Sequence, residues 1–210
     1  WHGNMENYKN SKFKIFKLQK KNQYSFVNKR LVKSFKKRNL NGKLIVPNLK
    51  NYLNIKSQIE NSYLNSTIND ENMSNLFALA KTLKISDKSL IKSLKSFTGL
   101  PHRYEIFLRR KNCIFVNDSK ATSFQSTKFA LKSSNNIYWI LGGQPKKNDK
   151  VDIRSFNKKI IKSYIVGKHI NFFKKQIHNK IPYHISRSLK NSIINSLKDI
   201  KIDKKKNSTI

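Results

Sequence analysis

The chain has 210 residues, of which 37% are hydrophobic, and its formal net charge at pH 7 is +34. This length accommodates one large domain or two small ones with a packed core. The sequence contains no run of about 18 apolar residues and does not begin with a secretory signal, so we expect no membrane partner. The single cysteine, Cys113, excludes an internal disulfide, and its apolar surroundings predict a buried structural thiol in a cytoplasmic protein.

The positive charge comes mainly from lysine, since only seven of the 45 basic residues are arginine. Specific base readout and bidentate phosphate contacts favour arginine. The lysines are spread along the whole chain with many Asn and Ile residues, and these three residue types share A/T-rich codons. A genome bias therefore explains the charge better than a binding patch. We expect no specific nucleic-acid partner, only a weak and salt-sensitive attraction to polyanions.

The first half of the chain is predicted to be mainly helical. In chain order we expect a helix over 5–19, strands over 24–27 and 44–46, an ambiguous polar segment over 52–63 that fits a pair of strands, and helices over 73–83 and 86–97. Ser86 fits the N-cap of the last helix. Gly99 and Pro101 then break the helical pattern, because glycine frees the backbone and proline disfavours helix just before it.

The second half alternates strands and helices. We expect strands over 113–116, 137–141, 164–166 and 183–185, and helices over 126–132, 153–162, 170–177 and 189–197. This alternation predicts an α/β fold with a mostly parallel sheet and flanking helices. We therefore place a domain boundary near 98–103, which gives domains over 1–98 and 99–210. The tail over 198–206 is expected to be a solvated run of charges.

Three segments place glycine and polar residues where strands or helices end. They are Gly-Leu-Pro-His-Arg at 99–103, Asn-Asp-Ser-Lys-Ala-Thr at 117–122 and Gly-Gly-Gln-Pro-Lys at 142–146. The last two directly follow strands, and ligands of open parallel sheets bind beyond the carboxyl ends of strands. Lysines there can neutralise phosphate or carboxylate oxygens, and an arginine offers a fork suited to phosphate. Each segment alone equally fits a polar loop with a helix cap.

Together, in this order, the three segments resemble the D-glutamate-adding Mur ligase family. That family carries a Gly-Leu-Pro-His-Arg-type motif at the start of its C-terminal domain, then Asn-Asp-Ser-Lys-Ala-Thr with a Ser-Thr pair, here Ser126 and Thr127, and then a Gly-Gly-x-x-Lys turn. Residues 1–16 look like the family segment after its Asp-His-Leu-Asp stretch, and 72–75 look like its His-Asn-x-x-Asn helix start. The resemblance implies a Rossmann-like C-terminal domain over 99–210, preceded by the partial second half of the α/β central, ATP-binding domain over 1–98.

Carried over position by position, the resemblance implies roles for nine residues. Lys12 matches a lysine that the family carbamylates to give an anionic ligand near Mg²⁺. Asn72 and Asn75 match residues near the metal and the adenine of ATP, although Glu71 stands where the family usually has histidine. The remaining six residues belong to 99–210: His102, Arg103 and Asp118 match the ATP site, and Lys120, Thr122 and Lys146 match residues that hold D-glutamate and the developing charge. The implied catalytic residues are Lys12, His102, Lys120 and Lys146.

The activity implied by the resemblance is an ATP-dependent acid–amino-acid ligation in peptidoglycan synthesis. ATP phosphorylates the carboxylate of UDP-N-acetylmuramoyl-L-alanine, and the amine of D-glutamate attacks the acyl phosphate in a monomeric, cytoplasmic enzyme that uses Mg²⁺. The sequence contains no P-loop and lacks the family's N-terminal uridine-nucleotide domain and the end of its C-terminal domain, so we expect no ligation by this chain alone. The alternatives are a sibling ligase, such as a folylpolyglutamate synthase, and a lysine-rich nucleic-acid-binding protein.

Overall fold

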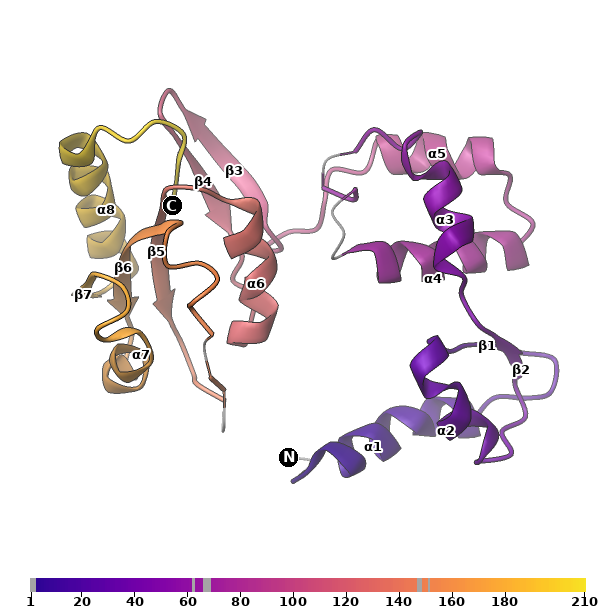
Figure 1. Cartoon of the computed structure of the whole chain (residues 1–210). Helices are drawn as coiled ribbons and strands as arrows, with labels where there is room; N and C mark the ends of the chain where they lie inside the picture. Colours follow the sequence, from indigo (N-terminus) through magenta and orange to yellow (C-terminus); the bar gives the residue numbers. More distant parts are fainter. Residues whose placement is uncertain (1–2, 62, 66–68, 147–148, 151) are drawn as a thin grey trace. The chain divides into compact units, whose positions relative to one another are not determined.

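A computed structural model of the chain describes residues 3–61, 63–65, 69–146, 149–150 and 152–210. The chain divides into two compact units, Trp1–Thr98 and Gly99–Ile210 (Figure 1). Trp1 and His2, with which the first family-like segment begins, lie outside the described residues. Each unit has its own clusters of buried hydrophobic side chains, so each has a core of its own.

The beginning of unit 1 packs a helix against a small parallel sheet. Its elements are α1 (Met5–Lys17), β1 (Tyr24–Phe26), the 3-10 helix η1 (Lys29–Leu31), α2 (Val32–Lys36) and β2 (Lys43–Ile45). Asn4 caps α1, since its side chain accepts a hydrogen bond from the backbone N–H of Asn7 at 2.8 Å. Phe13, Val27 and Phe35 form a buried cluster between these elements. The helix and both strands expected here are confirmed.

Three further helices are seen in the described part of unit 1, namely α3 (Leu49–Lys56), α4 (Asp70–Thr82) and α5 (Asp87–Lys95). The strand pair expected over 52–63 is wrong, because 52–56 belong to α3 and 57–58 form a turn. Tyr52 and Ile55 lie at helical spacing and are buried in one cluster with α4 and α5, so burial of a helical face decides the structure of this polar segment. Ser86 caps α5 as expected, accepting from the backbone N–H of Ser89 at 3.2 Å.

Unit 2 is a six-stranded, mostly parallel sheet with flanking helices. Its elements are β3 (Glu105–Arg110), β4 (Cys113–Asn117), α6 (Phe124–Ser133), β5 (Ile137–Gly142), β6 (Ile160–Val166), α7 (Ile170–Ile177), β7 (Tyr183–Arg187), α8 (Leu189–Asp203) and β8 (Ser208–Thr209). The strand order is β3-β4-β8-β5-β6-β7, and each neighbouring pair is parallel except β3 and β4. The predicted α/β fold class is therefore confirmed.

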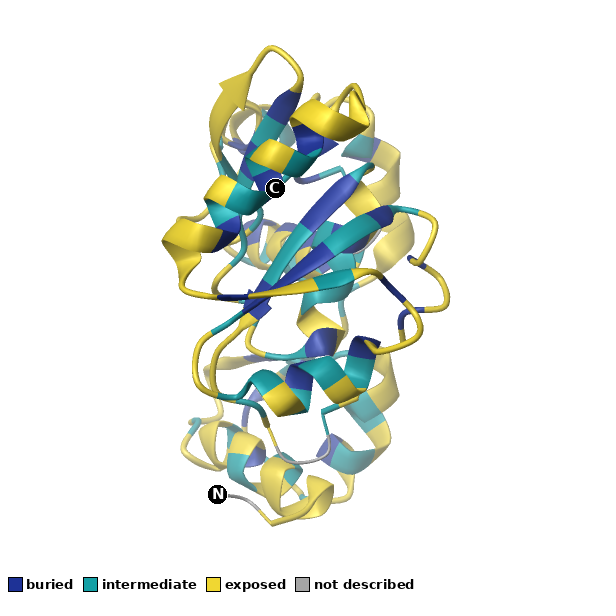
Figure 2. Cartoon of the chain, turned by 90° about the vertical axis from the view of Figure 1, so that its left-hand side faces the viewer, coloured by how far each residue is buried: buried dark blue, intermediate teal, exposed yellow. Residues whose placement is uncertain are grey.

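The side chains of the central strands alternate between two buried faces. On β5, Ile137 and Leu141 join the cluster beneath α6 and α7, whereas Tyr138 joins the cluster beneath α8. Figure 1 shows α6 and α8 on opposite sides of the sheet. In Figure 2 the strands of this unit carry many of its buried residues. Covering both faces with helices is typical of parallel sheets.

Helix α8 is fixed to the sheet by two hydrogen bonds between tyrosine and aspartate. The hydroxyls of the fully buried Tyr138 and Tyr164 donate to Asp203 Oδ2 at 2.7 Å and to Asp199 Oδ2 at 2.5 Å. The expectation of a solvated charge run over 198–206 is therefore wrong in part. Its first residues extend α8 and bring two carboxylates to the buried tyrosines.

Two segments of unit 2 differ from the expected structure. The helix expected over 153–162 is wrong, because 154–159 form turns and β6 begins at Ile160. The segment from Ile160 to Val166 is β-branched or aromatic except at Lys162 and Ser163, which fits a strand that is buried on both faces. Strand β3 was not expected, and it forms an antiparallel edge hairpin on which Phe107 is 59% exposed.

Cys113 on β4 is buried, as expected, and burial raises the pKa of its thiol. Its thiol is therefore kept in the unreactive protonated form. Among the residues that the structure describes, no helix is long and apolar enough to cross a membrane.

Candidate functional site

The polar loops of unit 2 follow the carboxyl ends of β4, β5 and β6. These strands run in the same direction in one sheet, so their carboxyl ends meet at one edge. The loops at this edge are residues 117–123, 142–146 and 167–169, which we call the carboxyl edge. Two of the three segments that the sequence singled out therefore lie side by side in the fold.

Lys146 joins the loops that follow β4 and β5. Its Nζ donates a hydrogen bond to Thr122 Oγ1 at 3.1 Å, and both side chains are exposed. Among the described residues Lys146 makes no ion pair, so its ammonium charge is not neutralised by a carboxylate of the chain. Lys120 is exposed in the same loop as Thr122. The structure thus brings all three residues with an expected substrate role to one edge.

The segment that follows Gly99 folds back onto the loop after β4. The backbone N–H of Lys120 donates to the carbonyl oxygen of His102 at 3.0 Å, and Asn117 Nδ2 lies 2.8 Å from His102 Nδ1. If Asn117 donates this bond, His102 Nδ1 is the acceptor and Nε2 carries the ring proton. The backbone N–H of His102 also donates to Glu105 Oε2 at 2.9 Å. These contacts position His102 next to the loop in a left-handed backbone conformation, with φ of 63°.

Asp118 carries a buried carboxylate oxygen that has no partner. Its Oδ1 accepts the backbone N–H of Tyr104 at 3.0 Å, whereas Oδ2 makes no hydrogen bond within the described residues. Burial raises the pKa of Asp118 despite the opposing effects of the Tyr104 bond and the positive charge of Arg103. Unpartnered buried oxygens are rare in native proteins. Asp118 therefore has an unused hydrogen-bond acceptor beneath the surface of this loop.

Two glycines shape the loop after β5. A side chain at Gly142 would place its Cβ 2.3 Å from the carbonyl oxygen of Val166, so glycine is required where β5 and β6 approach each other. Gly143 has a φ of +107°, and a Cβ there would meet no atom within 4 Å. The first glycine thus permits close strand packing, and the second turns the chain beside open space at the carboxyl edge.

The structure adds connections that the sequence did not reveal. Asp149 accepts the backbone N–H of Phe124 through Oδ2 at 3.1 Å, which ties the chain after β5 to the first turn of α6. His169 Nε2 lies 2.9 Å from Gln144 Oε1 and links the loops after β5 and β6. Each of these bonds joins residues 25 positions apart. No local pattern marks such pairs, because only the fold brings them together.

The expected site residues of unit 1 have local contacts. Lys12 is exposed on α1, with Nζ 5.4 Å from the centre of the Tyr8 ring. Asn72 is exposed near the start of α4, and Asn75 Nδ2 donates to the carbonyl oxygen of Glu71 one turn earlier at 2.8 Å. Among the described residues no group of three or more His, Cys, Asp or Glu side chains could hold a metal ion.

Glu71, the residue that departs from the family pattern, is engaged within unit 1. Its Oε1 lies 3.2 Å from Arg30 Nη2 and accepts from Asn28 Nδ2 at 2.5 Å. Both partners belong to the segment between β1 and α2. The glutamate therefore ties the start of α4 to this segment by an exposed ion pair, which is a weak interaction in water.

Several curated proteins are similar to this chain in sequence, although no protein-family model matches it. UDP-N-acetylmuramoylalanine–D-glutamate ligase of Wolbachia sp. subsp. Brugia malayi is 38% identical over 120 residues, which cover 57% of this chain and 24% of that protein. The enzymes of the same name from Rickettsia felis and Mesorhizobium japonicum are 34% and 39% identical, covering 66% and 59% of this chain and 31% and 27% of those proteins. The chain matches part of a D-glutamate-adding Mur ligase. It spans about a quarter to a third of the length of these relatives.

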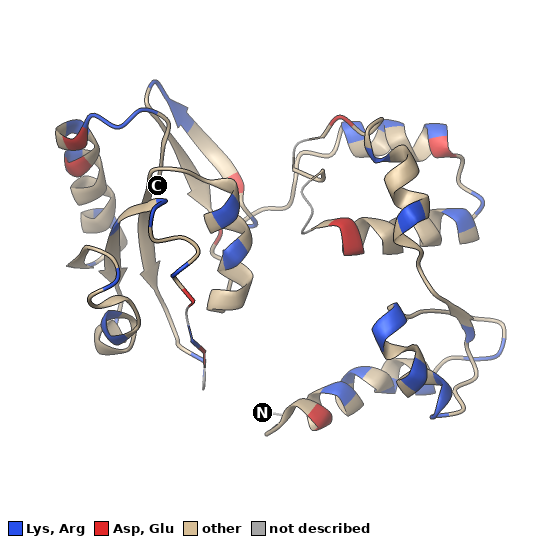
Figure 3. Ribbon diagram, viewed as in Figure 1, with Lys and Arg blue, Asp and Glu red and all other residues tan. Residues whose placement is uncertain are grey.

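Solved Mur ligase structures overlap with the chain only partially. A crystal structure of MurF from Acinetobacter baumannii has a TM-score of 0.46 and 12% sequence identity, covering 67% of this chain and 32% of that one. The assignment to the D-glutamate-adding Mur ligases rests on the sequence relatives and on the segments at 99–103, 117–122 and 142–146. Lysine and arginine are spread over helices and loops of both units (Figure 3), which gives no support to a nucleic-acid-binding patch.

Proposed function

We propose that this chain is part of an ATP-dependent ligase that joins D-glutamate to UDP-N-acetylmuramoyl-L-alanine through an acyl phosphate. The observation that carries the proposal is the hydrogen bond from Lys146 to Thr122, because it unites two of the family-like segments at one edge of the sheet. The relatives of this name are three to four times longer than the matched segments. The whole reaction therefore belongs to the longer enzyme, and this chain contributes the carboxyl edge.

The substrate role falls on the two exposed lysines of the carboxyl edge and on Thr122. Thr122 holds the Lys146 ammonium through a neutral oxygen, so the positive charge stays available for a carboxylate of D-glutamate. Lys120 adds a second cation in the same loop. Placing cations where negative charge develops lowers the barrier of acyl and phosphoryl transfer. These residues bind and orient the amino acid and stabilise the charge of the tetrahedral intermediate.

The nucleotide role falls on Asp118, Arg103 and His102. The unpartnered Oδ2 of Asp118 is an acceptor for a ribose hydroxyl, and the guanidinium of Arg103 suits a phosphate. His102 is held against the same loop by Asn117, so its Nε2–H can donate to a phosphate oxygen. ATP, when bound, supplies the phosphoryl group. Asn72 and Asn75 of unit 1 are proposed to contact the nucleotide, and Lys12 is proposed to be carbamylated.

A titration of the 210-residue chain with D-glutamate tests this proposal, with the amide signals of 117–123 and 142–146 followed by NMR. We expect saturable shifts at both loops, weaker effects of L-glutamate, and an affinity about tenfold lower for Lys146→Ala, which corresponds to about 1.4 kcal/mol. Lys190→Ala, which removes an exposed lysine of α8, serves as the matched control and should leave the affinity unchanged.

Two outcomes would contradict the proposal. Equal responses to D- and L-glutamate would favour a sibling ligase with a different amino-acid substrate. Equal losses of affinity in Lys146→Ala and Lys190→Ala would mean that only the overall charge matters. In a parallel assay we expect the chain alone to release no phosphate from ATP in the presence of both substrates, because the sequence contains no P-loop.

A further inference from the structure

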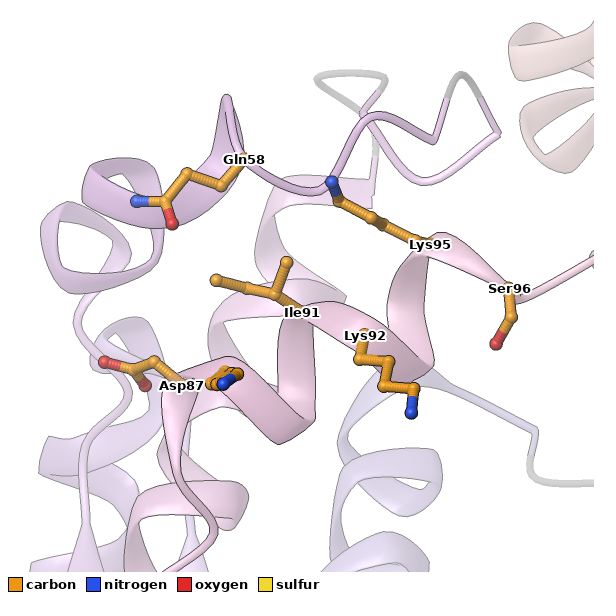
Figure 4. Close-up of a pocket in the computed structure, with 7 residues that line it drawn as sticks. Gln58, Asp87, Ile91, Lys92, Lys95 and Ser96 are labelled. Atoms are coloured by element: carbon orange, nitrogen blue, oxygen red, sulfur yellow. The ribbon is translucent and has the colours of Figure 1, made fainter.

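A groove in unit 1 lies apart from every residue to which a role has been given. Its volume is about 640 Å³, and it lies between α5 and the turn that follows α3. The lining residues are Gln58, Asp87, Lys88, Ile91, Lys92, Lys95 and Ser96. Figure 4 shows Gln58 on the turn that follows α3 and Ile91, Lys92 and Lys95 on α5, with the side chains of the two lysines turned in different directions.

The groove is lined by three lysines of one helix. Lys88, Lys92 and Lys95 follow one another at spacings of four and three residues, which places them along one face of α5. From the first to the last, the helix rises by about 10 Å. Like charges at this spacing repel each other, so an anion bound along the row relieves an unfavourable arrangement.

The two carboxylates nearest this row are already engaged. Asp87 Oδ1 lies 2.7 Å from Lys81 Nζ, and Glu60 Oε2 lies 3.0 Å from Lys95 Nζ. Within the part of the chain that the structure describes, Lys88 and Lys92 have no ion-pair partner. The positive potential of the groove is therefore only partly neutralised by the chain's own acidic groups.

The row of lysines is carried by a well-anchored helix. Leu90 and Leu94 hold α5 in the buried cluster of unit 1, and half-buried Ile91 provides an apolar floor between the cations. Lysine presents a compact ammonium on a flexible stem, which adapts to several charged oxygens rather than to one planar carboxylate. A row of about 10 Å fits an anion with charges spread over consecutive phosphates.

We propose that this groove binds a small polyphosphate anion. The phosphate oxygens pair with Lys88, Lys92 and Lys95, and Gln58 donates its amide N–H groups from the opposite side. The site lies wholly within unit 1, and its lining includes none of the residues to which the nucleotide or D-glutamate of the ligase reaction is assigned. The size of the groove favours a compact ligand over a nucleic-acid strand.

Calorimetric titration of the 210-residue chain with inorganic tripolyphosphate tests this proposal. We expect Lys88→Gln/Lys92→Gln to weaken binding at least tenfold. The matched control is Lys33→Gln/Lys37→Gln, which removes two exposed lysines at the same spacing from unit 1 and should weaken binding less than twofold. The methyl signals of Ile91 should shift on saturation in the parent chain and stay unchanged in Lys88→Gln/Lys92→Gln. Circular dichroism checks that both variants keep their helices.

Three results would overturn the proposal. Equal losses in the two double variants would mean that tripolyphosphate responds only to the overall charge. Loss of binding in Lys120→Gln/Lys146→Gln with an unchanged Ile91 signal would place the anion at the carboxyl edge. Displacement of tripolyphosphate by a short RNA of higher affinity would make the groove part of a nucleic-acid-binding surface. The D-glutamate titration of the carboxyl edge is independent of all three results.

Discussion

The carboxyl edge of unit 2 and the expected site residues of unit 1 differ in how the chain holds them. At the carboxyl edge, bonds between distant segments fix the loops, as Lys146 does with Thr122 and Asn117 with His102. In unit 1, Lys12 lies over Tyr8 four residues earlier, and Asn75 bonds to the preceding turn of its own helix. The first region is preorganised by the fold of one unit, whereas the second consists of separate surface positions. Preorganised groups bind ligands with a smaller loss of conformational entropy.

The largest effect is expected from the close approach of β5 and β6, which supports the carboxyl edge. Gly142→Ala places a methyl group against the Val166 carbonyl, and we expect unit 2 to lose about 2–3 kcal/mol of stability. Gly143→Ala, which meets open space but has a positive φ, should cost about 1 kcal/mol. Urea unfolding followed by the fluorescence of Trp139 on β5 measures both. If the two variants lose the same free energy of unfolding, the close approach of β5 and β6 does not constrain the carboxyl edge.

A smaller effect is expected from the bonds that hold α8 under the sheet. Burial raises the pKa of Asp199, but hydrogen bonds from Lys162 and Tyr164 outweigh it and hold the pKa below its usual range. As the pH falls, the Asp199 carboxylate is therefore protonated in the unfolded chain before it is protonated in the folded chain. The folding stability that the charged carboxylate provides above about pH 4 is lost as the pH falls below this value. Asp199→Asn should cost about 1–2 kcal/mol at neutral pH and flatten the acid side of the stability profile.

The control for this prediction is Asp152→Asn, which changes a half-exposed carboxylate beside Arg154 and should cost less than about 0.5 kcal/mol. Thermal unfolding of unit 2 between pH 3 and 7 provides the profile. An unchanged acid limb in Asp199→Asn would contradict the assignment of this carboxylate as the group that α8 needs in its charged form.

The sequence predicted most elements of the fold, and its errors have physical causes. Strands such as β4 and β5 were recognised because continuous apolar runs end in polar loops, and parallel packing then placed those loops at one edge. The segment over 52–63 was misread because its buried positions, among them Tyr52 and Ile55, are separated by polar residues. The segment over 153–162 was misread because Ile153 and Phe156 have the spacing of a buried helical face, although 154–159 form turns.

The contacts of the carboxyl edge were less predictable than its composition. The sequence singled out the residues of the loops, and their roles in the reaction stay predictions. It did not reveal that Asn117 contacts His102, or that Asp149 ties the chain after β5 to α6, since these bonds depend on tertiary structure. The tyrosines that anchor α8 were likewise hidden, because a charged segment normally indicates a solvated surface.

A double-mutant cycle on Thr122 and Lys146, measured by D-glutamate titration of the 210-residue chain, tests the central claim most directly. If the two residues form one binding unit, Thr122→Val should weaken binding by about 0.5–1 kcal/mol in the parent chain and have almost no effect in Lys146→Ala, giving a coupling of at least about 0.5 kcal/mol. Additive losses in the double variant, or no saturable binding of D-glutamate at the loops, would contradict the account.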